Sequence, residues 1–296
     1  MLRATATLVL GLAAWAGRAQ QAAPIVPELP PMEVHNGELL FTPVSQTPSG
    51  LAFNPKIVNG VVENPSNWPG TFIAKAGGQQ CTATLVGPRV LLTAAHCVGP
   101  GAAVRIEFPD GSSATGHCDR PSSWSKQAPS VDLALCLMSA PVLQSSVAYE
   151  NISLESARVP KNGVLVLAGY GCTAADNPVP PAVPTLTSGK AVVDATPGAL
   201  AYWPGWLLTK SFTVDGSAYL CKGDSGGAAF FVLGKLRQVV AVASAFESRV
   251  GHKDFGRSYL TALSAAPART FFEDWVRDRN ALVCGYKGFS HVRCRS

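Results

Sequence analysis

The stretch GDSGG at residues 223–227 places Ser225 between glycines, directly after the acidic residue Asp224. Glycine permits backbone conformations that other residues rarely adopt, and its missing side chain leaves room beside the serine hydroxyl. Glycine-rich stretches of this length are common in loops, so GDSGG alone is also compatible with an ordinary turn. Two motifs upstream decide between these interpretations.

The two upstream motifs supply the other groups that a serine nucleophile requires. TAAHC at residues 93–97 contains His96, and DLAL at residues 132–135 begins with Asp132. Acyl transfer by serine needs an imidazole that accepts the hydroxyl proton, a carboxylate that holds the imidazole, and backbone N–H groups directed at the developing oxyanion. The three motifs together therefore predict nucleophilic catalysis by Ser225.

The composition is that of a globular protein with a sizeable core. Of the 296 residues, 47% are hydrophobic and 15% charged, which argues against a disordered chain. The 28 Gly and 23 Pro follow no repeat period, which excludes collagen and argues against a helical solenoid. The net charge is +5, but the basic residues form no run, so nucleic acid is not an expected partner.

Residues 1–19 predict a secretory signal peptide. Arg3 precedes an apolar stretch at residues 6–16, and small residues follow up to Ala19, after which we expect cleavage. The apolar stretch is too short to cross a hydrocarbon core of ~30 Å as a helix, so we expect no membrane attachment after cleavage. The protein is therefore expected to be secreted, extracellular or periplasmic, with oxidised cysteines.

Residues 20–56 predict a pro-segment, since they contain seven prolines, no cysteine and little periodicity.

The body begins near Ile57 and contains all eight cysteines. Its short β-type runs, separated by turn residues, predict a sandwich or barrels, and the amphipathic stretch 267–279 predicts a C-terminal helix. The runs are residues 71–76, 82–86, 90–93, 104–108, 132–138, 164–168, 192–195, 228–233 and 238–243.

The motif order, histidine before aspartate before serine, resembles the chymotrypsin-like (trypsin-like) serine protease family. A fourth motif, KIVNG at residues 56–60, is similar to the family's activation site, although Asn59 stands where glycine is more usual. The resemblance covers about residues 57–279. It implies a secreted serine endopeptidase that is made as a zymogen.

The resemblance also implies the fold. We expect an all-β chain with two antiparallel six-stranded β-barrels and a C-terminal α-helix. Residues 57–296 would form one protease domain. The first barrel would occupy about residues 57–160, and the second barrel with the helix about residues 161–296.

The family's catalytic roles carry over position by position. Ser225 would be the nucleophile, His96 its general base and then general acid, and Asp132 the carboxylate that orients the imidazole. The N–H groups of Gly223 and Ser225 would form the oxyanion hole. Ser244 stands where the family places a serine that supports the catalytic carboxylate.

Activation follows from the same resemblance. Cleavage after Lys56 would free the amino group of Ile57, which would pair with Asp224 and order the loop that carries Ser225. A pocket that rejects basic residues would not accept Lys56. We therefore expect a separate trypsin-like protease to be the activating partner.

The residues of the specificity pocket depart from the trypsin pattern. Tyr219, six residues before Ser225, stands where trypsin-type enzymes carry an aspartate, so no charge favours Arg or Lys. Phe246 replaces a glycine of wide-pocketed relatives. The pocket would prefer small or apolar side chains or be plugged, unless Tyr219 and Phe246 only pack in the second barrel. Lys222 would face either the substrate or solvent.

The resemblance implies a bridge between Cys81 and Cys97 and another between Cys172 and Cys221. Proximity and elimination then pair Cys118 with Cys136 and Cys284 with Cys294. Cys284 and Cys294 could also bind a metal together with His291, but an exported chain favours a disulfide. We expect no metal site and no cofactor.

A non-catalytic binding module or inactive protease homologue on the same fold is the alternative function. The intact catalytic and activation motifs argue against it, and only the unusual pocket favours it. For the enzyme we expect a monomer that acts on a protein or peptide substrate. Asn151 begins a glycosylation sequon whose use depends on the host.

Overall fold

The computed structural model describes most of the chain after the expected pro-segment. The expected signal peptide at 1–19 and pro-segment at 20–56, including Lys56, lie outside the described residues. Within the described part, no helix is long and apolar enough to cross a membrane. The described ranges are 57–125, 131–155, 159–172, 185–199, 204–212, 216–234, 236–248 and 255–295.

Six antiparallel strands close the first barrel in the order β2-β3-β4-β7-β6-β5. Its interior is filled by aliphatic side chains such as Leu85, Leu91 and Ile106, which are fully buried. Burial of these side chains supplies the main stabilisation of the barrel. The strands are β2 (Thr71–Ala76), β3 (Gln79–Gly87), β4 (Val90–Thr93), β5 (Ala103–Glu107), β6 (Ser113–Asp119) and β7 (Ala134–Met138).

A second six-stranded barrel closes in the order β9-β10-β11-β14-β13-β12, with β12 returning to β9. Two short strands extend this sheet, because β1 (Val61–Val62) pairs with β10 and β8 (Asn151–Ile152) pairs with β13. The two barrels confirm the expected all-β architecture. The barrel strands are β9 (Val164–Gly169), β10 (Thr187–Ala195), β11 (Trp206–Phe212), β12 (Ala228–Leu233), β13 (Leu236–Ser248) and β14 (Phe255–Ala262).

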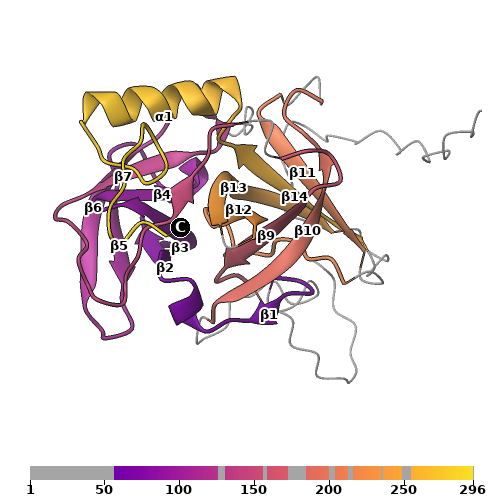
Figure 1. Ribbon diagram of the computed structural model, residues 1–296, viewed down its shortest axis with the longest axis horizontal. Helices are drawn as coiled ribbons and strands as arrows, with labels where there is room; N and C mark the ends of the chain where they lie inside the picture. Colours follow the sequence, from indigo (N-terminus) through magenta and orange to yellow (C-terminus); the bar gives the residue numbers. More distant parts are fainter. Residues whose placement is uncertain are drawn as a thin grey trace, which may run out of the picture. The chain divides into compact units, whose positions relative to one another are not determined.

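The C-terminal helix α1 (Ala266–Asp278) confirms the helix expected at 267–279. Pro267 lies in its first turn, where the missing N–H of proline costs no helical hydrogen bond. Phe272 and Trp275 are buried, and the indole N–H of Trp275 donates to Asp119 Oδ2 of β6 at 2.9 Å. The helix therefore packs on the first barrel although it follows the second in sequence, as Figure 1 shows.

All four expected disulfides are present: Cys81–Cys97, Cys118–Cys136, Cys172–Cys221 and Cys284–Cys294. Cys81–Cys97 ties β3 to the short 3-10 helix η2 (Ala95–Cys97) that contains His96. Cys172–Cys221 ties the chain after β9 to the segment that precedes Ser225. Two of the bridges thus restrain the segments that carry the candidate catalytic residues.

Candidate active site

The pairing of two first-barrel strands brings His96 and Asp132 together. β4 pairs with β7 so that Thr93 lies opposite Ala134, and His96 and Asp132 lie just beyond this pair. The backbone N–H of His96 donates to Asp132 Oδ1 at 2.8 Å. The ring atom Nδ1 of His96 lies 2.6 Å from Asp132 Oδ2. These two contacts fix the orientation of the imidazole.

Asp132 is buried and strongly hydrogen-bonded. Only 2% of the residue is exposed. The Ser244 hydroxyl donates a third hydrogen bond to this carboxylate, at Oδ2 and 2.7 Å. Burial alone would lower the pKa of His96, but the negative charge of Asp132 and the hydrogen bond to it outweigh this effect and raise that pKa above its usual value. Asp132 therefore stabilises the protonated form of His96.

Close contacts with first-barrel residues hold the GDSGG loop. The N–H of Thr82 donates to the Ser225 carbonyl at 2.9 Å, and the N–H of Gly226 donates to the Ala243 carbonyl at 2.7 Å. Gly226 has a φ of +82°, and a Cβ on it would lie 2.1 Å from the Thr93 hydroxyl oxygen. Only glycine fits this position, and the loop therefore lies directly against the strand that leads to His96.

Within the described residues, no hydrogen bond joins Ser225 Oγ to His96 Nε2. The Nε2 atom instead contacts Cys97 Sγ at 3.7 Å. Hydrogen bonds of this kind are often loose without substrate and tighten in the reactive complex. The structure thus assembles the histidine, its carboxylate partner and the serine loop, while the serine–histidine contact is open.

Asp224 lies fully buried behind the loop. Its two carboxylate oxygens accept hydrogen bonds from the N–H groups of Gly171 and Cys221, each at 2.8 Å. Burial raises the pKa of Asp224 to about 7, because within the described residues no cation compensates the lost hydration. A Cβ on Gly169 or Gly171 would lie 2.3 or 2.4 Å from the carboxylate, so both glycines make room for it.

Ile57, the first described residue, is fully buried in the core of the second barrel. Its neighbour Val58 forms an isolated β-bridge with Tyr219. Ile57 has a φ of +38°, which is unusual for a β-branched residue. The first described residues are thus anchored inside the barrel that carries Ser225.

Tyr219 is 2% exposed and packs with Val58 and the Cys172–Cys221 disulfide. A Cβ on Gly256 would lie 2.3 Å from the Tyr219 ring, so the ring lies directly on that glycine. Phe246 is half-buried against the core of the second barrel, and Lys222 is exposed. Tyr219 therefore fills space within the second barrel and offers no charge to a substrate.

Among the described residues, one cluster has the side-chain types of a metal site: Cys81, His96 and Cys97. The two cysteine sulfurs are bonded to each other in a disulfide, so neither is available as a thiolate ligand. The candidate site at Cys284 and Cys294 is likewise closed by a disulfide. These cysteines are therefore bonded in disulfides and offer no thiolate ligand.

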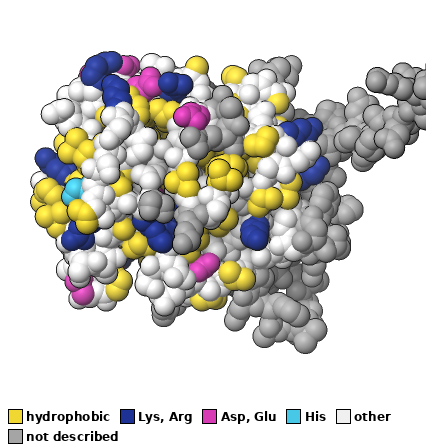
Figure 2. Space-filling view, in the orientation of Figure 1, with side chains coloured by type: hydrophobic (Ala, Val, Ile, Leu, Met, Phe, Trp, Pro, Cys, Tyr) yellow, Lys and Arg dark blue, Asp and Glu magenta, His cyan; other side chains and the backbone are white. Residues whose placement is uncertain are grey.

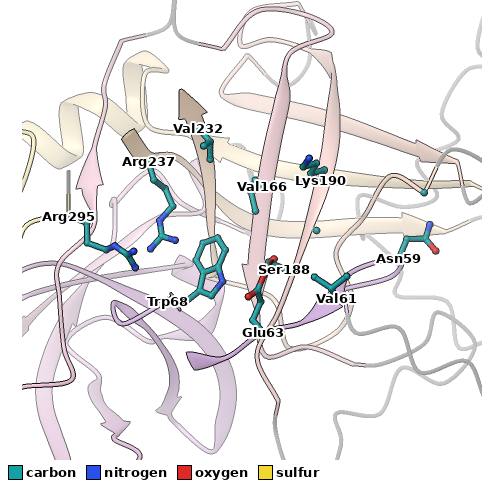
Figure 3. A pocket seen from close by; sticks show the side chains of 12 residues that line it. Asn59, Val61, Glu63, Trp68, Val166, Ser188, Lys190, Val232, Arg237 and Arg295 are labelled. Carbon is teal, nitrogen blue, oxygen red and sulfur yellow. Dashed lines mark hydrogen bonds between the residues drawn. The ribbon is translucent and has the colours of Figure 1, made fainter. Parts of the chain in front are cut away.

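A groove of about 570 Å³ is lined by none of the residues His96, Asp132 and Ser225 (Figure 3). Arg237, one of its lining residues, pairs with the buried Glu150 and lies over the ring of Trp68 at 4.1 Å. Figure 2 shows basic side chains among hydrophobic ones on the molecular face that it displays. The groove is lined by Asn59, Val61, Glu63, Trp68, Val166, Ser188, Gly189, Lys190, Gly216, Val232, Arg237 and Arg295.

Four residues of the site were not identified from the sequence: Thr82, Thr93, Gly169 and Gly171. In the sequence, the two threonines have the pattern of ordinary strand residues. Their contacts with the serine loop form only when the two barrels pack together. The sequence Gly-Tyr-Gly before Cys172 is a visible signal, because glycines two positions apart indicate close approach of another group.

Comparisons with known proteins agree with this geometry. The family model described as Trypsin matches residues 57–258, more than half of the chain. Snake venom serine protease KN3 from Trimeresurus stejnegeri is 27% identical over 207 residues, which cover 63% of this chain and 76% of the relative. Snake venom serine protease 2C from Craspedocephalus gramineus is 26% identical over 207 residues, with the same two shares. The chain belongs to the trypsin family and is a serine endopeptidase.

Proposed function

We propose that the chain is a secreted enzyme that hydrolyses protein or peptide substrates through Ser225, with His96 and Asp132 as its catalytic partners. One observation carries the proposal: the chain of hydrogen bonds from Ser244 through Asp132 to His96, next to the glycine-flanked serine loop. Four disulfides and the venom relatives support an extracellular location. Nothing supports the periplasmic alternative.

In this mechanism, Ser225 Oγ attacks the scissile carbonyl carbon while His96 Nε2 accepts the hydroxyl proton. Asp132 holds the Nδ1–H of His96 and so leaves Nε2 free to act as the base. His96 then gives the proton to the leaving amine, and a water molecule hydrolyses the acyl-enzyme by the same route.

The oxyanion would be bound by the N–H groups of Gly223 and Ser225. Within the described residues, neither N–H group donates a hydrogen bond to a protein acceptor. Both groups are therefore available to a developing oxyanion. Gly223 reaches its conformation with a φ of +101°, which glycine adopts without strain.

Activation would follow cleavage after Lys56. The buried Asp224 has no cationic partner within the described residues, and a new amino group on Ile57 would supply one. Ile57 is already buried in the second barrel. Cleavage would also remove its φ torsion, because that angle is defined by the carbonyl carbon of Lys56, and so would relieve a backbone strain of about 1–3 kcal/mol.

The primary specificity would not be for Arg or Lys, because Tyr219 is buried at the position where a charge would be required. A pocket occupied by this ring would accept a small or apolar side chain. The Lys56–Ile57 bond would then need a separate activating protease. Purified precursor should stay intact on its own, and processing that occurs in wild type but not in Ser225→Ala would contradict this proposal.

A peptide library tests the proposed activity. Precursor, protein cleaved after Lys56 by immobilised trypsin, and cleaved Ser225→Ala are incubated with the library separately. We expect new peptide ends only with the cleaved wild type, with few after Arg or Lys. Equal cleavage by Ser225→Ala would show that Ser225 is not the nucleophile.

The alternative is an inactive homologue that acts as a binding module, and the filled position of Tyr219 is the observation that favours it. The variant Tyr219→Gly separates the two possibilities. In an enzyme with a plugged pocket, this change opens space and broadens cleavage toward larger side chains. In an inactive homologue, neither form cleaves any peptide.

We propose that the enzyme acts as a monomer.

A further inference from the structure

One buried side chain of the first barrel, Thr82 in β3, connects two segments of the second. Its hydroxyl donates a hydrogen bond to the Gly223 carbonyl at 2.9 Å and accepts one from the Tyr170 N–H at 3.0 Å. A hydroxyl has one donor and accepts through its lone pairs, so this side chain uses both capacities. The residue is 0% exposed, so water does not compete for these bonds.

The backbone of Thr82 strengthens the same connection. Its N–H donates to the Ser225 carbonyl at 2.9 Å, and its carbonyl accepts the hydroxyl of Thr93 at 2.9 Å. Thr93 precedes His96 by three residues. One residue therefore links the serine loop to the strand that leads to the histidine.

The hydroxyl of Thr82 restrains a residue that has little conformational preference of its own. Gly223 lacks a Cβ, and its φ of +101° is only one of many values open to glycine. A hydrogen bond to its carbonyl fixes the peptide plane between Gly223 and Asp224. The Gly223 N–H lies in the preceding peptide plane, whose Lys222 carbonyl accepts the Cys172 N–H at 2.7 Å. With both planes held, the φ and ψ angles of Gly223 are restrained, and so is the direction of its N–H.

The second bond of the hydroxyl reaches the segment that contacts Asp224. Tyr170 is followed by Gly171, whose N–H donates to Asp224 Oδ1 at 2.8 Å. Thr82 thus joins two segments that meet at the buried Asp224 carboxylate. Both segments would have to be in place when the oxyanion hole is formed.

We propose that Thr82 is a positioning residue that orients the oxyanion-hole loop from the opposite barrel. This inference rests on the proposed function of Gly223 and Ser225. β-propensity alone does not explain the contacts, because Thr84 of the same strand is equally buried and its hydroxyl has no hydrogen-bond partner within the described residues. Thr84 is therefore the matched control.

Thr82→Val keeps the side-chain shape but leaves the Gly223 carbonyl and the Tyr170 N–H unpaired. We expect kcat to fall about 10- to 100-fold while KM changes little, because the hydroxyl acts on transition-state stabilisation and not on substrate binding. Thr82→Ser retains the hydroxyl and should keep most of the activity. Thr84→Val should behave as wild type.

The pH profile separates positioning from general damage. The His96–Asp132 contacts do not involve Thr82, so the acidic midpoint of the kcat/KM profile should be the same in Thr82→Val and wild type. Amide hydrogen exchange of peptides that contain residues 170–171 and 223–226 should be faster in Thr82→Val only. Both measurements use the full chain after cleavage at Lys56.

Each outcome decides the proposal. Full activity of Thr82→Val, or an equal loss in Thr84→Val, overturns the role of Thr82 and leaves the proposed function intact. If Thr82→Val and Thr82→Ala both fail to fold while Thr82→Ser folds, the hydroxyl is a folding requirement and positioning is overturned. If cleaved wild type shows no activity, the proposed function fails, and the role of Thr82 fails with it.

Discussion

Asp132 accepts three hydrogen bonds while it is 2% exposed, from the backbone and ring of His96 and from Ser244. These donors take the place of the water that burial removes from the carboxylate. Its charge in turn raises the pKa of His96. Residue types and spacing predicted His96 and Asp132 as partners. The open contact between Ser225 and His96 could not be predicted, because it depends on side-chain rotation.

Asp132→Asn should lower kcat by about 10⁴-fold, because the amide no longer stabilises the imidazolium or the required tautomer. It should also move the acidic midpoint of the kcat/KM profile to lower pH, since the charge that raises the pKa of His96 is lost. Hydrolysis rates measured across pH test both expectations. Ser244→Ala leaves the charge in place and serves as the control. An unchanged midpoint in Asp132→Asn would contradict the account.

Asp224 gives the precursor a characteristic pH dependence. Burial raises its pKa to about 7, above the ordinary carboxyl value of ~3.9. Between these values the folded precursor retains a proton that the unfolded chain has lost, so the free energy of unfolding falls as pH rises through this window. Asp224→Asn should remove that slope. Urea unfolding of both precursors at several pH values measures it, and identical slopes would contradict the buried, unpaired carboxyl.

Strand β13 carries both a residue of a buried ion pair and a residue that contacts Asp132 of the candidate site. One end carries Arg237, which pairs with Glu150, and the other carries Ser244 and Phe246. Glu150 is fully buried, whereas the Arg237 side chain is 15% exposed. Figure 3 shows Arg237 beside Trp68, over whose ring it lies. The pair therefore anchors β13 near its first residue, Leu236.

Arg237→Met should destabilise the protein by about 3–5 kcal/mol, because it leaves Glu150 buried without its cation. Glu150→Gln in the Arg237→Met background should restore part of the loss, since no charge then remains buried. Chemical denaturation of the wild type and both variants measures these differences. A change below about 1 kcal/mol in Arg237→Met, the usual range for exposed pairs, would show that the pair is not effectively buried.

The sequence predicted strands well where hydrophobic side chains dominate, as in β2, β4 and β12. It did not predict β6, β11 or β14. β6 contains Gly116, where a Cβ would lie 2.6 Å from the Leu137 carbonyl oxygen, and β14 contains Gly256 beneath Tyr219. Glycine weakens a strand pattern, and the contacts that require it come from distant residues.

At the scale of the molecule, the candidate site combines residues of both barrels. His96 and Asp132 come from the first barrel, and the Ser225 loop and Ser244 from the second. The motifs predicted this division through the family resemblance. Thr82 was not predicted, because its bond to Gly223 joins residues that are 141 positions apart and depends on how the barrels meet.

Activation should give the processed enzyme an alkaline limit. The α-amino group of Ile57 has an ordinary pKa of ~7.7–8.0, and pairing with Asp224 would raise it. The ion pair would be complete below the ordinary value and lost as pH rises through the raised one. Activity measured at rising pH should therefore decline reversibly. Unchanged activity at strongly alkaline pH would contradict an ion-pair switch.

Labelling with a fluorophosphonate is the most direct test of Ser225 as the nucleophile of a cleavage-activated enzyme. Precursor, protein cleaved after Lys56 and cleaved Ser225→Ala are treated in parallel, and mass spectrometry locates the label. The account predicts about one label per cleaved wild-type molecule, on Ser225, with little on the precursor and none on Ser225→Ala. Cleaved, folded wild type that never labels at Ser225 would contradict it.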